Sequence, residues 1–149
     1  MHAQGSARTA LTAGSLFATS QETGLSYVLA YNPDRFLAPA YTALGKTPKA
    51  SSYGGWESRQ IQGHMLGHYL SALAIHYAST GSQACYDRMK YMLAELKRCQ
   101  DANGDGYIGG VPNSHQLWSE VKKGDFTLLR RTWCPWYNVH KIFAGLRDA

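Results

Sequence analysis

The stretch Ile61-Gln-Gly-His-Met-Leu-Gly-His-Tyr-Leu-Ser-Ala-Leu-Ala-Ile-His-Tyr-Ala78 decides the fold class of this sequence. It contains no formally charged side chain, and its apolar residues recur at helical spacing. On a helix its side chains form two broad faces: Met65, Leu66, Tyr69, Leu70, Leu73 and Tyr77 on one, and His64, His68, Ala72 and Ile75 on the other. A helix without a charged face is buried on nearly all sides. We therefore expect residues 61–78 to form an inner helix.

The next segment, residues 83–100, has a different pattern. One stripe at helical spacing is apolar and includes Cys85, Met92 and Cys99, while charged side chains occupy the rest of the surface. Such a helix is covered on one side only. A buried helix followed by an amphipathic one favours two concentric layers over a simple bundle, in which every helix would be amphipathic. The sequence therefore predicts an all-α fold with inner and outer helices.

Local signals place the remaining elements. Two helices are expected between Leu16 and Gly45, interrupted at Asn32-Pro33-Asp34, because proline disfavours helical geometry in the preceding residue. Residues 47–55 and most of residues 101–131 are expected to be loop, and a last helix begins near Pro135 without a stop signal before Ala149. We expect residues 1–20 to be a flexible N-terminal segment and residues 21–149 to be the ordered part.

Composition excludes several classes of partner. The formal net charge is +5, but the basic residues are scattered in short pairs, so no nucleic-acid footprint is indicated. No apolar stretch is long enough to span a membrane, and no signal peptide is recognisable, so the compartment is unknown. Cys85 and Cys99 lie too far apart on one helix to form a disulfide, and an odd count of three cysteines argues against a disulfide framework.

Two motifs raise the question of a metal. Residues 101–108 match the opening of a calcium-binding loop, but its twelfth position is Pro112, which offers no ligand, so we expect a polar turn. His64 and His68 share a helix face at a spacing that can chelate zinc, but no third ligand is evident. Buried structural histidines and histidines lining a polar pocket both remain open. We expect no metal site within this chain.

The four tryptophans, Trp56, Trp118, Trp133 and Trp136, are all expected in or beside loops. Trp56 and the Trp133–Tyr137 stretch also flank predicted helix starts. Aromatic faces beside histidines and a carboxylate suit a sugar, whose C–H face stacks on the ring while its hydroxyls find polar partners. Ordinary packing explains any single tryptophan equally well.

Five motifs in order carry a family resemblance. They are Asn32-Pro-Asp-Arg-Phe-Leu-Ala-Pro39, Tyr53-Gly-Gly-Trp-Glu-Ser58, Gly63-His-Met-Leu-Gly-His-Tyr-Leu-Ser-Ala-Leu73, Cys99-Gln-Asp-Ala-Asn-Gly-Asp-Gly-Tyr-Ile-Gly-Gly110 and Pro135-Trp-Tyr-Asn-Val-His-Lys-Ile-Phe-Ala-Gly-Leu146. Together they resemble glycoside hydrolase family 127, the bacterial β-L-arabinofuranosidases. The resemblance covers nearly everything from about Gly24 to Ala149.

The resemblance implies a fold and a chemistry. The family has an (α/α)6 barrel, of which this chain would supply an N-terminal, incomplete part. Its retaining mechanism uses a zinc-bound cysteine thiolate as nucleophile and a glutamate as acid/base. Those residues lie downstream of the motifs present here, so zinc is expected only in the full-length enzyme, with its ligands outside this chain. The partners implied are a carbohydrate of plant-type glycans and the missing C-terminal part of the same barrel.

The resemblance also suggests residues that line a sugar site. His140 matches a family position that looks like a sugar-hydroxyl ligand, and the weaker candidates are His64, His68, Trp56, Glu57 and Tyr137. No catalytic residue is assigned, because glycoside cleavage needs a second carboxyl or nucleophile opposite the acid. We therefore expect the chain by itself to be inactive. The alternatives are a non-catalytic sugar-binding helical module and another α/α-toroid polysaccharide-degrading enzyme, such as a lyase.

Overall fold

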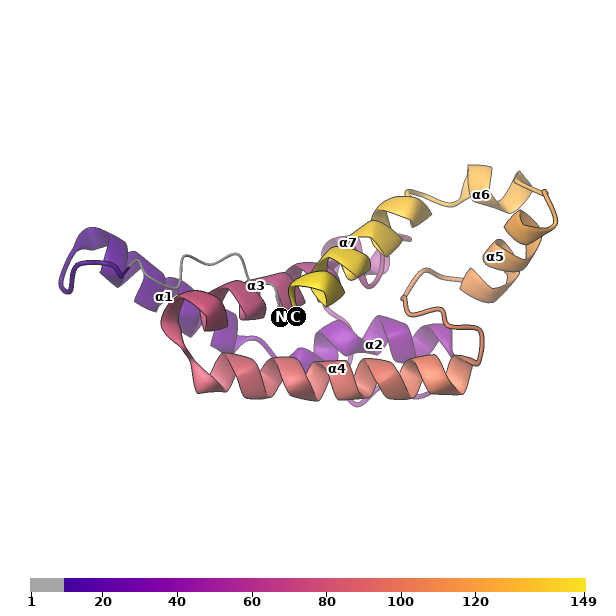
Figure 1. Cartoon of the computed structure of the whole chain (residues 1–149). Coiled ribbons are helices and arrows are strands. Elements are labelled where there is room, and N and C mark those ends of the chain that lie inside the picture. The colour runs from indigo at the N-terminus through magenta and orange to yellow at the C-terminus, as the bar shows by residue number, and fades with distance from the viewer. Residues whose placement is uncertain (1–9) are drawn as a thin grey trace.

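The computed structural model describes residues 10–149 and shows helices joined by loops, without a strand among these residues (Figure 1). The elements are α1 (Leu16–Ala30), α2 (Pro33–Ala43), a short 3-10 helix η1 (Gly55–Ser58), α3 (His64–Thr80), α4 (Gln83–Asn103), α5 (Ser114–Lys122), α6 (Thr127–Arg131) and α7 (Pro135–Asp148). The predicted all-α class is confirmed. None of the described helices combines the length and the apolar character needed to cross a membrane.

The helix boundaries follow local capping signals. The Asn32 side chain accepts a hydrogen bond from the Asp34 amide and starts α2, with Pro33 in the first turn. Gly81, in the left-handed region at φ 69°, ends α3, and Ser82 caps α4. Helix α1 begins at Leu16, inside the segment 1–20 that we expected to be flexible. Residues 1–9 of that segment lie outside the described residues.

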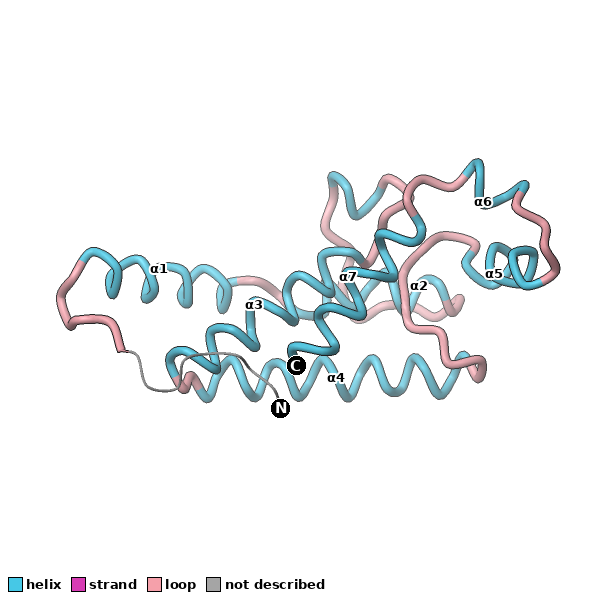
Figure 2. Tube along the Cα trace, turned by 45° about the horizontal axis from the view of Figure 1, so that its top comes forward, coloured by secondary structure: helices cyan, strands magenta, loops and turns pink. Residues whose placement is uncertain are grey.

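Helices α3 and α7 run side by side in the same direction, as Figure 2 shows. The Asn138 side-chain amide donates to the carbonyls of Ile61 (2.9 Å) and Gln62 (2.6 Å), just before α3. Further along, the Ser71 hydroxyl in the middle of α3 donates to Asp148 at the C-terminal end of α7, at 2.7 Å. The sequence separation is nearly constant, 76 or 77 residues, in these bonds. A constant separation requires parallel helices, which is the arrangement of neighbouring inner helices in a toroid of helical pairs.

Two glycines allow α3 and α7 to touch along their backbones. A Cβ placed on Gly67 would lie 2.0 Å from the Lys141 carbonyl oxygen, and one on Gly145 would lie 2.3 Å from the Gly67 carbonyl oxygen. Backbone atoms cannot move aside as side chains can, so any side chain at either position would force the helices apart. Glycine is therefore required at this crossing.

Helix α4 forms the outer layer. It lies along α3 and α2 (Figure 1) and buries one stripe that includes Cys85, Met92 and Cys99 against them. The predicted contrast between an inner and an outer helix is confirmed, and the described part of the chain is consistent with part of an (α/α)6 barrel.

The expectation that α3 is covered on nearly all sides is wrong. On its second face His64 is buried and Ala72 is partly buried, but His68 is exposed and Ile75 is 63% exposed. In the described chain, α3 packs mainly against α7 and α4, with smaller contacts to α1 and α2. The absence of charged residues therefore shows that this face of α3 is uncharged, but it does not show whether another element covers the face.

The expectation that residues 101–131 are mostly loop is also wrong. Helix α4 continues to Asn103, and α5 and α6 occupy much of the remainder. Trp118, which we placed in or beside a loop, lies within α5. The N-cap of α5, Asn113, has a left-handed backbone at φ 56° and makes no side-chain cap bond, so the usual start signal is missing. Leu117 is buried and anchors the helix through packing instead.

Candidate functional site

Side chains from three parts of the chain meet at the N-terminal ends of α3 and α7. The His64 ring lies 6.0 Å from His68, 6.1 Å from Tyr137 and 6.4 Å from Trp56, between ring centroids. Trp133 lies 5.9 Å from Trp56 and extends the group. We call these five residues, Trp56, His64, His68, Trp133 and Tyr137, the aromatic–histidine cluster. It brings together four of the six residues that the sequence singled out.

Glu57 lies beside the cluster but has a structural role. It is 3% exposed, and its carboxylate accepts hydrogen bonds from the Gly63 amide (2.7 Å) and the Met65 amide (3.0 Å). These amides belong to the first turn of α3, where helical N–H groups lack partners within the helix. The negative charge also suits a helix N-terminus. Glu57 therefore fixes the start of α3, and its oxygens are already engaged.

The surroundings of His64 determine its tautomer. Its Nδ1 lies 2.8 Å from the Ile61 carbonyl oxygen and 2.6 Å from Glu57 Oε1. Both partners can only accept, so Nδ1 must carry a proton and donate. In the neutral ring, Nε2 is then an acceptor. His64 is 4% exposed, so Glu57 and the backbone hold this ring in place at the edge of the cluster.

His68 is held toward its neutral form. Although His68 is exposed, partial desolvation of its ring lowers its pKa, and the nearby positive charge of Lys141 and the His64 ring lower it further. A histidine normally titrates near pH 6.5, so a lowered pKa leaves the ring uncharged at neutral pH. A neutral imidazole has one donor and one acceptor nitrogen, which matches the two roles of a hydroxyl group.

Tyr137 and His140 are both exposed on α7. They are three residues apart, so they project from the same side of the helix. The Lys141 ammonium lies 5.0 Å from the centroid of the Tyr137 ring. No contact recorded in the described chain joins His140 directly to the cluster, so it lies along the same helix side rather than inside the group.

Sequence reasoning missed two contributors. The Gln60 side-chain oxygen accepts a hydrogen bond from the Trp133 amide at 2.9 Å and so ties the segment before α7 to the loop before α3. Lys141 influences both Tyr137 and His68. Trp133 was singled out beside a predicted helix start, but its contact with Trp56 was not predicted. No sequence signal pairs Trp133 with Gln60, because the two are 73 residues apart.

The cluster can bind a neutral, hydroxylated ligand, but it lacks the parts for bond cleavage. Trp56 is 59% exposed and Trp133 is 46% exposed, so their rings are available for stacking. Hydrolysis of a glycoside requires a second carboxyl group or another nucleophile opposite the acid. Glu57, the carboxylate that contacts His64 of the cluster, is engaged by the backbone of α3.

The described residues do not fit a zinc site. Among residues 10–149 no group of three histidine, cysteine, aspartate or glutamate side chains could hold a metal ion. Cys85 and Cys99 are buried in α4, and Cys134 is exposed before α7. No chemical step is therefore assigned to a metal held by these residues.

Comparison with known proteins gives one match. The protein-family model described as "Beta-L-arabinofuranosidase, GH127 catalytic domain" matches residues 10–149. No curated protein matches the chain.

Proposed function

The chain belongs to the β-L-arabinofuranosidase family, glycoside hydrolase family 127, and on this premise we propose that it forms the substrate-holding part of a barrel that cleaves β-L-arabinofuranosides of plant-type glycans. Membership of the family supports a glycoside hydrolase with a carbohydrate substrate. The finer assignment, to β-L-arabinofuranosides and to a retaining mechanism, is our proposal.

One observation supports this proposal most strongly. His64, His68 and Tyr137 converge from two parallel inner helices, with exposed tryptophan rings beside them. Uncharged rings that offer both donors and acceptors suit sugar hydroxyls, and the tryptophan faces suit the apolar side of a sugar ring. We propose that these residues and His140 hold and orient the sugar.

We propose that the nucleophile and the acid/base lie outside this chain. A retaining reaction needs two groups about 5–5.5 Å apart on opposite sides of the scissile bond. Glu57 has no such partner, so the residues described here position the substrate and exclude water. The purified chain should accordingly not hydrolyse an aryl β-L-arabinofuranoside, and turnover above a heat-killed control that persists through repurification would contradict this.

Binding can be tested on the chain itself. In an NMR titration of the ¹⁵N-labelled chain with L-arabinose, amide signals of residues in the aromatic–histidine cluster should shift and saturate. His68→Ala and His140→Ala should each weaken binding roughly tenfold, the value expected for losing a hydrogen bond to the ligand. His115→Ala, an exposed histidine outside the cluster, is the matched control and should leave the cluster shifts unchanged. Unchanged affinity in both test variants would contradict the proposal.

A non-catalytic sugar-binding module is the second candidate, and the engagement of Glu57 by α3 favours it. The reading frame that encodes the chain distinguishes the two. A frame that continues past Ala149 with a Cys-Cys pair and a nearby Glu-x-Cys supports the enzyme, and its longer product should turn over the aryl arabinofuranoside. A stop codon at this point, together with sugar binding by the chain, supports the binding module.

A further inference from the structure

A cleft of about 830 Å³ lies apart from the aromatic–histidine cluster. Its walls come from α2 and the turn after it, the loop around η1 and the loop that leads into α5, and they comprise Pro39, Thr42, Ala43, Gly45, Ser52, Tyr53, Gly54, Glu57, Ser58, Gln62, Gly110, Pro112, Asn113, Ser114, His115 and Gln116. Its volume falls within the range of roughly 300–1,000 Å³ that is usual for small-molecule sites. None of Trp56, His64, His68, Tyr137 and His140 lines it.

Gly110, which lines the cleft, packs closely against the start of α3. A Cβ on Gly110 would lie 2.4 Å from Pro39 Cβ and 2.8 Å from the Gln62 carbonyl oxygen. Gly63, at φ 92°, lies directly against Gly110, where its Cβ would come within 3.0 Å of the Gly110 nitrogen. The loop before α5 can therefore lie on the start of α3 only because both residues are glycine. The wall is a fixed contact between backbones.

Two residues that line this cleft each carry a buried polar atom without a partner. Ser114 is 2% exposed and lines the cleft, and its hydroxyl has no hydrogen-bond partner in the described chain. The Gln62 side-chain oxygen also lines the cleft, is buried and is unpaired. Leaving a buried polar group unsatisfied costs about 1–3 kcal/mol. Unpaired atoms at the wall of a cleft therefore indicate a polar ligand.

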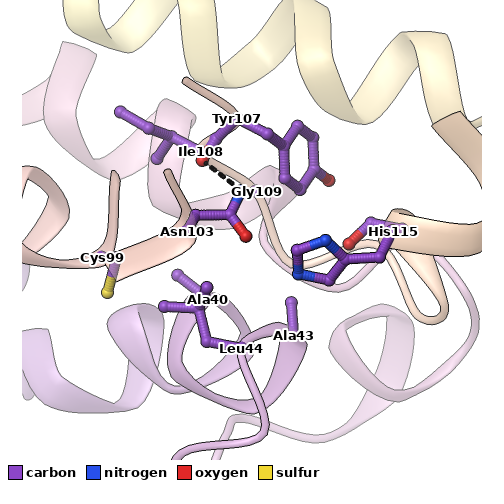
Figure 3. Close-up of a pocket in the computed structure, with 10 residues that line it drawn as sticks. Ala40, Ala43, Leu44, Cys99, Asn103, Tyr107, Ile108, Gly109 and His115 are labelled. Carbon is purple, nitrogen blue, oxygen red and sulfur yellow. Dashed lines mark hydrogen bonds between the residues drawn. The ribbon is translucent and has the colours of Figure 1, made fainter. Parts of the chain in front are cut away.

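The floor of the cleft continues into a small pocket of about 10 Å³, which shares Ala43, Ser114 and His115 with it (Figure 3). In Figure 3 the Asn103 side chain projects into this pocket, between Ala43 and the loop segment 107–109. Its Nδ2 donates to the Tyr107 carbonyl at 3.2 Å, while its Oδ1 has no partner. A pocket of this size holds about one water-sized group.

Tyr107 closes the far side of the small pocket. Burial raises the pKa of its hydroxyl, although the nearby Trp118, the Val111 backbone and Ser114 partly offset this effect. These groups are close to the hydroxyl, but neither it nor Ser114 Oγ has a partner of hydrogen-bonding geometry. At neutral pH the hydroxyl is therefore protonated and available to a small polar group entering from the cleft.

The charges around the cleft exclude an anionic ligand. No lysine or arginine lines it in the described chain, and the carboxylate of Glu57 is bound to the start of α3. Several hydroxyl and amide side chains line it, among them Thr42, Ser52, Ser58, Asn113 and Gln116. Many uncharged donors and acceptors with two buried unpaired oxygens match a neutral polyhydroxylated molecule.

We propose that this cleft is a second saccharide-binding site, which takes a neutral sugar through Gln62 and Ser114. It goes beyond the site proposed above, because none of the five residues of the aromatic–histidine cluster lines the cleft. Glu57 lies between the two sites: its carboxylate binds the start of α3 and His64, and the residue also lines the cleft. The proposal rests on the lining of the cleft and not on the role of the aromatic–histidine cluster.

The test is an NMR titration of the ¹⁵N-labelled chain with L-arabinose and, separately, with xylobiose. Amide signals of Gln62, Gly110 and Ser114 should shift and saturate, with a Kd on the order of millimolar. Ser114→Ala should weaken this binding roughly tenfold without lowering the thermal midpoint, because its hydroxyl makes no hydrogen bond that folding would lose. Inorganic phosphate and glucuronic acid should cause no saturable shift at these amides.

Two further variants complete the design. Thr42→Trp places a large side chain in the cleft from an exposed position and should abolish the shifts at Gln62 and Ser114 while the chain melts as the parent does. His68→Ala, in the cluster, should leave them unchanged. Shifts confined to the cluster, or an unchanged affinity in both Ser114→Ala and Thr42→Trp, would overturn the second site and leave the first intact. Shifts at the cleft alone would support the second site and count against the first.

Discussion

At the scale of single residues, Glu57 shows how a side chain can suit two interpretations. A glutamate beside tryptophan and histidine is what a sugar-cleaving site contains, yet here both carboxylate oxygens accept from the α3 backbone. His64 then takes its orientation from the same carboxylate. The residue supports the site by fixing the helix that carries it.

Glu57→Gln should therefore lower stability. The amide keeps one acceptor oxygen and loses the charge that suits the helix N-terminus, so we expect a loss of about 1–3 kcal/mol in the free energy of unfolding by urea. Glu22→Gln, at an exposed position of α1, is the matched control and should change this value by no more than about 0.5 kcal/mol. Equal unfolding curves for the two variants would show that Glu57 does not hold α3.

Glu95 is a second buried carboxylate, in the outer layer. Burial alone would raise its pKa, but hydrogen bonds from Tyr41 and Lys49 and the positive charges of Lys49 and Arg98 hold the pKa below its usual value. The Lys49 ammonium lies 2.9 Å from Glu95 Oε2. The hydrogen bond to Glu95 is also the main cause that raises the pKa of Tyr41 to about 12.

This lowered pKa predicts a loss of stability in acid. A carboxyl whose pKa is lower in the folded than in the unfolded state contributes stability above its unfolded pKa of about 4.3, and this contribution disappears as the pH falls through the folded value. Urea unfolding at pH 7 and pH 3 should show the drop, and Glu95→Gln should reduce it. Tyr41→Phe, which removes one hydrogen bond to Glu95, should reduce it partly. If both variants lose as much stability between pH 7 and pH 3 as the parent chain does, the acid sensitivity comes from groups other than Glu95.

At the scale of elements, the contact between α3 and α7 organises the site. Asn138 satisfies the carbonyls that precede α3, and Gly67 and Gly145 let the two backbones approach. The parallel direction brings the N-terminal ends of both helices to the same end of the molecule, and the cluster forms there. A shift between the helices would separate His64 from Tyr137.

Gly145→Ala should destabilise the chain by about 1–3 kcal/mol, because its Cβ would press on the Gly67 carbonyl and push α7 away. Gly24→Ala in α1 is a matched control. Its Cβ would meet only the His76 ring, at 3.5 Å, which is ordinary contact, and alanine favours a helix over glycine by about 1 kcal/mol. The thermal midpoint, followed by circular dichroism, should therefore fall for Gly145→Ala and rise for Gly24→Ala. A higher midpoint for both variants would disprove the close crossing of α3 and α7.

At the scale of the whole molecule, large apolar side chains remain exposed on several helices. Phe17 in α1 is 76% exposed, Ile75 in α3 and Phe143 in α7 are each 63% exposed, and Trp136 is 57% exposed. Exposed apolar surface of this kind marks a region that other protein surfaces cover or that promotes association. The main cluster of buried apolar residues, in contrast, lies between α2, α3 and α4, while Leu117 of α5 and Ile142 of α7 are also buried.

We therefore expect the isolated chain to associate and to bind a hydrophobic dye. The double variant Ile75→Glu/Phe143→Glu should lower dye fluorescence and the apparent mass in light scattering, because it places charges on exposed positions without touching the core. Leu11→Glu, at an exposed residue that precedes α1, should change neither measurement. A monodisperse monomer that binds no dye in the parent chain would contradict the expectation.

The sequence by itself determined the all-α class, several helix boundaries and the family. Asn32, Pro33, Gly81 and Ser82 act on the backbone within a few residues, so their effects can be predicted locally. The family motifs likewise pointed to His64, His68, Tyr137 and Trp56, which the structure brings together. The sequence did not predict α5, because this helix starts without a capping side chain and is held by the packing of Leu117 instead of a local signal.

Only the tertiary structure decided which faces are covered and which polar groups find partners. The exposure of His68, the bond between Gln60 and Trp133 and the unpaired oxygens of the cleft all depend on segments far apart in the chain. The physical reason is range. Helix formation follows from neighbours a few residues away, whereas burial and hydrogen-bond pairing follow from which distant surfaces meet, and residues about 76 positions apart carry no local signal of their contact.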